Sequence, residues 1–106
     1  MANLNQIMDY LADEFTTETI GCGSGITLSS GTIGTYATAK SVDITKSGYR
    51  PIAATFIGYG HGSSYHVVLD INGNSLIFMF YRSIASSYSV PTDDIKAMVI
   101  YRKTTS

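Results

Sequence analysis

The fold class is decided by the stretch Tyr65-His66-Val67-Val68-Leu69-Asp70-Ile71-Asn72-Gly73-Asn74-Ser75-Leu76-Ile77-Phe78-Met79-Phe80-Tyr81, in which Asn72-Gly73 separates two apolar runs. Asn-Gly in this position predicts a β-hairpin, because both central residues of a type I′ turn need a positive φ. With residues 72–73 as a two-residue loop, one face of the hairpin is apolar, pairing Ile71 with Asn74, Leu69 with Leu76, Val67 with Phe78 and Tyr65 with Phe80. A slip of one residue would bring polar Ser75 onto that face, so the turn chemistry and the alternation agree.

The opposite face of this hairpin is half apolar, which is more than a face open to solvent requires. It carries His66, Val68 and Asp70 on one strand and Ser75, Ile77, Met79 and Tyr81 on the other. A second apolar face of this kind favours contact with a neighbouring subunit. We therefore expect Val68, Ile77 and Met79 to belong to an oligomer interface.

Outside the hairpin, short apolar stretches alternate with turn residues. Pro51 opens an apolar strand over residues 52–57, and residues 26–28 alternate like a short strand. The last strand, from Ile95 to Lys103, places four side chains inward, namely Ile95, Ala97, Val99 and Tyr101. Six to eight short strands with frequent turns predict a mainly β protein, an antiparallel, jelly-roll-like β-sandwich.

The first fifteen residues follow a different pattern. Their apolar side chains are spaced by three and four and so share one helical face, at Leu4, Ile7, Met8, Leu11 and Phe15. A helix of about a dozen residues is marginal alone in water, so its apolar stripe needs cover from the rest of the domain or from identical copies. We expect residues 1–15 to form an oligomerisation helix that uses Leu4, Ile7 and Leu11. Residues 16–41 would be a Ser/Thr/Gly-rich connector with the first strands, and residues 42–106 the sandwich body, in one domain overall.

Length and composition exclude several classes of protein. The chain has 106 residues, 44% hydrophobic and 14% charged, with a net charge of −1, which fits one folded domain. Without a basic stripe, binding to nucleic acid through phosphate neutralisation is not expected. No apolar run approaches the roughly 18 residues of a membrane span, and no signal peptide opens the sequence, so we expect synthesis in the cytoplasm. A single cysteine, Cys22, excludes an intrachain disulfide framework.

Residues that could carry chemistry do not form a recognisable constellation. His61 and His66 are five residues apart, and a zinc site needs a third ligand, whereas Asp70 lies about 13 Å from His66 along a strand. Cys22 sits between glycines, where we expect it to be exposed, with no local base to activate it. The glycine-rich segments 21–25 and 58–62 have no lysine or helix after them to hold a phosphate. We therefore expect no enzymatic activity, no metal and no cofactor.

Tyrosine is the one unusual residue type, with eight in the chain. Several tyrosines lie in or beside expected loops, and tyrosine gives rigid, amphipathic contact area that suits recognition. An alternative function is therefore a small monomeric carbohydrate-binding module that uses Tyr59, His61, Tyr65 and Tyr88.

The whole chain resembles a family of small phage structural proteins. The resemblance rests on the opening residues 1–13, the Ser/Thr/Gly connector, and a body that runs from Val42-Asp43-Ile44-Thr45-Lys46-Ser47-Gly48-Tyr49 to Val99-Ile100-Tyr101-Arg102-Lys103. It is similar to phage-type proteins from prophage regions of gut Firmicutes, and in plan to the receptor-binding or fibre-head modules of tails and baseplates. The resemblance implies a short helix followed by a β-sandwich, assembled as a homotrimer and located in the virion. Its implied partners are copies of itself, other tail proteins or a cell-surface glycan.

Overall fold

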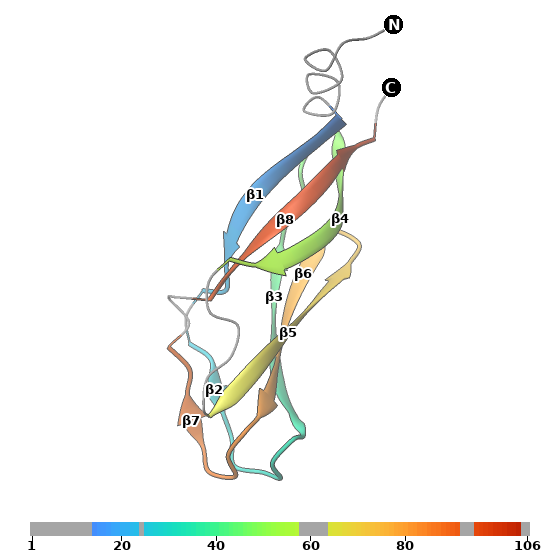
Figure 1. Cartoon of the computed structure of the whole chain (residues 1–106). Coiled ribbons are helices and arrows are strands. Elements are labelled where there is room, and N and C mark those ends of the chain that lie inside the picture. Colours follow the sequence, from blue (N-terminus) through green and yellow to red (C-terminus); the bar gives the residue numbers. More distant parts are fainter. Residues whose placement is uncertain (1–13, 24, 58–63, 92–94, 105–106) are drawn as a thin grey trace, which may run out of the picture.

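The computed structural model describes residues 14–23, 25–57, 64–91 and 95–104 and is mainly β (Figure 1). Within these residues the strands are β1 (Phe15–Gly21), β2 (Thr27–Leu28), β3 (Tyr36–Asp43), β4 (Tyr49–Phe56), β5 (Tyr65–Asn72), β6 (Ser75–Arg82), β7 (Tyr88–Ser89) and β8 (Lys96–Lys103). The expected N-terminal helix falls almost entirely outside the described part. Phe15, which we placed on its apolar stripe, instead begins β1.

The strands form three antiparallel sheets. Two are three-stranded, with the orders β1-β8-β4 and β3-β6-β5, and the third pairs β2 with β7. The first sheet joins the two ends of the chain, because Phe15 on β1 lies opposite Arg102 on β8. β4 is an edge strand, which explains how Pro51 is accommodated within it although proline cannot donate to a ladder.

The hairpin of β5 and β6 forms as expected, but our register was wrong by two residues. The two-residue loop is Gly73-Asn74, so Asn72 pairs with Ser75 and Ile71 with Leu76. Only Gly73 of the loop has a positive φ, +61°, which fits a turn with glycine in its first central position rather than the type I′ turn we expected. The shift places Asn74 in the turn instead of opposite Ile71. Because a shift of two residues preserves the alternation, the apolar side chains of that face remain the same.

The expected inward faces of β5, β6 and β8 pack into a single core, although Leu69 and Ile71 of β5 are only half-buried. On β8 the alternation is complete, with Ala97, Val99 and Tyr101 fully buried and the residues between them exposed or half-buried. Tyr101 also connects separate parts of the fold, because its hydroxyl donates a 2.8 Å hydrogen bond to the carbonyl oxygen of Ile44, beyond β3. The buried cluster consists of Cys22, Ile26, Leu28, Ile44, Tyr65, Val67, Leu76, Phe78, Phe80, Val90, Ile95, Ala97, Val99 and Tyr101.

The burial of Cys22 also differs from what the sequence predicted. Its glycine neighbours suggested an exposed thiol, but the residue is only 1% exposed. Its backbone N–H donates to the carbonyl oxygen of Ile95 at 3.0 Å, which draws the segment after β1 against the segment before β8. The side chain is thereby part of the core.

Among the described residues, no helix has the length and apolar character needed to cross a membrane.

Candidate functional site

The strongest candidate for a functional surface is the outer face of the β3-β6-β5 sheet, the face directed away from the core. The expected interface residues come together here, since Val68 on β5 pairs with Met79 on β6, and Ile77 lies two residues along β6 on the same face. Val68 is 41% exposed, whereas Ile77 and Met79 are half-buried. We define the outer face by the side chains of Tyr36, Ala39, His66, Val68, Ile77, Met79 and Tyr81.

One end of the outer face carries a row of three rings, one from each strand. The imidazole of His66 stacks on the ring of Tyr81, with centroids 5.3 Å apart and planes 10° apart. The ring of Tyr36 meets the ring of Tyr81 edge-on, at 5.9 Å and 75°. Tyr36 is 52% exposed, so this aromatic row of Tyr36, Tyr81 and His66 is open at its β3 end. Rings with polar tips suit both protein contact and ligand recognition.

Arg82 fixes the segment that carries Tyr36. Its guanidinium donates from Nη1 to the carbonyl oxygen of Tyr36 at 2.7 Å and to Oγ1 of Thr35 at 2.9 Å. It also donates from Nε to the carbonyl oxygen of Ser29 at 3.0 Å. A planar, charged fork of donors can hold several acceptors in one geometry. Arg82 is therefore a positioning residue for the open end of the aromatic row.

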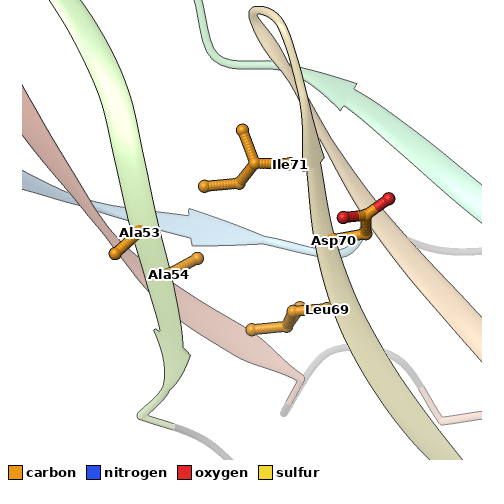
Figure 2. A pocket seen from close by; sticks show the side chains of 5 residues that line it. All are labelled: Ala53, Ala54, Leu69, Asp70 and Ile71. Atoms are coloured by element: carbon orange, nitrogen blue, oxygen red, sulfur yellow. The ribbon is translucent and has the colours of Figure 1, made fainter.

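A second feature lies at the side of the molecule, between β4 and β5. A cleft of about 230 Å³ is lined by Ala53, Ala54, Leu69, Asp70 and Ile71. Figure 2 shows the side chain of Ala54 directed towards Leu69 and Ile71, while the side chain of Ala53 and the carboxylate of Asp70 point away from the cleft. On the β4 side only the short side chain of Ala54 faces β5, which leaves the space beside β5 open.

The residues we assigned to a carbohydrate site are not gathered on the surface. Tyr65 is 5% exposed, since it begins β5 on the inward face and joins the core. Tyr88 is half-buried and stacks on Tyr65, with ring centroids 6.0 Å apart. Tyr65 is thus a core residue rather than a loop residue that a sugar could reach. Tyr59 and His61, like the expected interface residues Leu4, Ile7 and Leu11, lie outside the described part of the chain.

The surface tyrosine that sequence analysis missed is Tyr36. The alternation of the hairpin placed His66 and Tyr81 on the same face, but the row needs a ring from β3, a strand distant in sequence from the hairpin. No local pattern indicates that Tyr36 lies opposite Tyr81, because that pairing arises only when β3 joins the sheet.

The ionisation of the described side chains gives no sign of an activated nucleophile. Burial raises the pKa of the Cys22 thiol to about 11, with Lys40 acting in the opposite direction, so the thiol is protonated at neutral pH. A hydrogen bond from the hydroxyl of Thr45, supported by its backbone N–H, lowers the pKa of Asp43. Burial, with the nearby carboxylate of Glu18, raises the pKa of Tyr101.

No three histidine, cysteine or acidic side chains among the described residues are arranged to hold a metal ion. Comparisons with protein-family models, with curated proteins and with solved structures gave no match.

Proposed function

We propose that this chain is a non-enzymatic, self-associating module of a phage-derived surface structure, a tail or fibre component that contacts a host surface. In this proposal its body is a β-sandwich, the N-terminal residues form a helix, and three copies assemble around that helix. The proposal combines the resemblance described above with the physical character of the outer face of the β3-β6-β5 sheet.

The observation that carries the proposal is the uncharged, partly apolar centre of the outer face. Val68, Ile77 and Met79 are adjacent there, and the aromatic row continues the same surface. A contiguous apolar surface on a small domain is characteristic of an interaction site. Polar residues adjoin it at the end near the hairpin turn, where Asp70 pairs with Ile77 and Asp43 with Ser75. An apolar centre with a polar margin is the usual construction of a protein interface.

The direct test is the molar mass of the purified chain in solution, measured by size-exclusion chromatography with light scattering. We expect an oligomer for the wild type and a smaller species for Met79→Asp, which buries a carboxylate in the proposed interface. Ile33→Asp is the matched control, because Ile33 is 62% exposed and lies outside the outer face. A wild-type monomer at all accessible concentrations would refute self-association, and equal effects of the two substitutions would refute this location.

The aromatic row favours a saccharide as the ligand on the host surface. Tyr36 and Tyr81 each combine an apolar ring with a hydroxyl, and their two rings meet edge-on. A glycan array with the wild type and with Tyr36→Ala tests this second function. We expect binding to a restricted set of glycans that the substitution removes. Retention of the same glycans by Tyr36→Ala would exclude the row as their site.

A further inference from the structure

The free edge of β5 offers hydrogen-bonding groups to another strand. In the order β3-β6-β5, β5 pairs only with β6 among the described strands. The residues that flank a two-residue hairpin loop form a hydrogen-bonded pair, so Asn72 and every second residue before it direct their backbone groups towards β6. The N–H and C=O groups of Val67, Leu69 and Ile71 therefore point away from β6. Such a row of groups is a template for a further strand.

The cleft between β4 and β5 leaves room along this edge. It is lined from the β5 side by Leu69, Asp70 and Ile71 and from the β4 side by two alanines (Figure 2). The apolar side chains of Leu69 and Ile71 face the cleft and are half-buried. An added strand would cover them while it satisfied the backbone groups of β5.

The outward side chains of β5 identify the strand that fits this edge, because their order along the strand is complementary to the same order on a second, antiparallel copy of β5. They are His66, Val68 and Asp70, in that order, an imidazole, an apolar group and a carboxylate at equal spacing. If a second β5 lies antiparallel with the two Val68 residues opposite each other, each His66 faces an Asp70 of the other copy. The same register pairs Val67 with Leu69, whose backbone groups point to the free edge. An imidazole N–H can donate to a carboxylate directly across an antiparallel pair, and such a cross-strand contact stabilises the pair.

We propose that two copies of this chain associate through their β5 edges, antiparallel, with Val68 on the two-fold axis. The contact joins two three-stranded sheets into one of six strands. It is isologous, so each copy contributes the same residues. The inference rests on the proposed self-association and adds a specific contact to it, a two-fold contact that joins two copies or two trimers. The outer face remains open, because strands added at the β5 edge extend that face without covering it.

A disulfide formed across the axis tests the register. The two residues at position 68 would be a non-hydrogen-bonded pair, with Cα atoms about 4.5 Å apart, a separation that suits a disulfide. We expect Val68→Cys to give covalent dimers under mild oxidation, detected on a non-reducing gel. His66→Cys is the matched control, because in this register its two copies lie about 13 Å apart along the strands. The native Cys22 does not interfere, since it is 1% exposed.

Substitution of the His66–Asp70 pair provides an independent test that needs no new thiol. His66→Asp places a carboxylate opposite Asp70 at both ends of the contact, and we expect association to weaken about tenfold by sedimentation analysis. Asp70→Lys removes the carboxylate that faces His66 and should weaken association in the same direction. The double variant His66→Asp with Asp70→Lys places a carboxylate opposite an ammonium group and should recover association at least as strong as that of the wild type.

The possible results separate this contact from the outer face. Equal cross-linking at positions 66 and 68, or a double variant as weak as the single ones, would overturn the β5 pairing. If, besides one of these results, the wild type is an oligomer and Met79→Asp is a smaller species, the proposed function stands while this inference fails. A monomeric wild type, together with a Val68→Cys variant that forms no covalent dimer, would refute both.

Discussion

Tyr101→Phe, which removes one oxygen atom, tests how much the hydrogen bond between Tyr101 and Ile44 stabilises the fold. Tyr101 is fully buried, and its hydroxyl donates to the carbonyl oxygen of Ile44 at 2.8 Å. Ile44 is itself 3% exposed, and its N–H donates to the carbonyl oxygen of Asn74 at 2.8 Å. In Tyr101→Phe the ring still fills its place, but a buried carbonyl loses this donor. An unsatisfied buried acceptor costs about 1–3 kcal/mol, so we expect a loss of stability in that range.

The assay is urea denaturation followed by circular dichroism, with the free energy of unfolding extrapolated to water. With a slope of about 1–3 kcal/mol per molar urea, the midpoint should fall by about 1 M. Tyr36→Phe is the matched control, because it removes the same atom from a tyrosine that is 52% exposed, and we expect a change below about 0.5 kcal/mol. If both substitutions have the same small effect, the bond to Ile44 does not stabilise the fold as argued.

Three further predictions concern the hairpin turn, the buried thiol and the arginine behind the aromatic row. Gly73→Ala should lower the free energy of unfolding by about 1–2 kcal/mol in urea titration, because Gly73 has φ +61° and an added Cβ meets no atom within 4 Å, which leaves backbone strain as the cost. Burial raises the pKa of Cys22 to about 11 from 9.0, so its contribution to stability should be full below pH 9 and lost as the pH rises towards 11. The stability difference between wild type and Cys22→Ala, measured at pH 7.5 and pH 10.5, should therefore shift in favour of the variant at the higher pH, and a constant difference would contradict it. The N–H groups of Gly31 and Gly34 donate to the carbonyl oxygens of Ala85 and Arg82, in the segment that the Arg82 guanidinium holds through Ser29 and Thr35. Arg82→Lys should accelerate hydrogen exchange at these two amides and leave β8 unchanged, because one ammonium group cannot replace the fork of donors.

The alternation of side chains along each strand is encoded locally and could be predicted. The inward faces of the hairpin and of β8 follow from a period of two residues, which needs no knowledge of the neighbouring strand. The register in which two strands pair is less well determined by the sequence. Our hairpin register was wrong by two residues and still gave the right faces, because alternation cannot distinguish registers that differ by two. The turn decides between them, and here Gly73 takes the first loop position.

Sequence by itself thus determined that the chain is mainly β, where its clearest hairpin lies, and which side chains of that hairpin turn inward. The tertiary structure decided what meets across long separations. It places Phe15 beside Arg102, brings Tyr36 to Tyr81, and buries Cys22 and Tyr65. The reason is that strand order and burial depend on the total apolar surface that distant segments can cover together, whereas a sequence pattern reports only the preferences of adjacent residues.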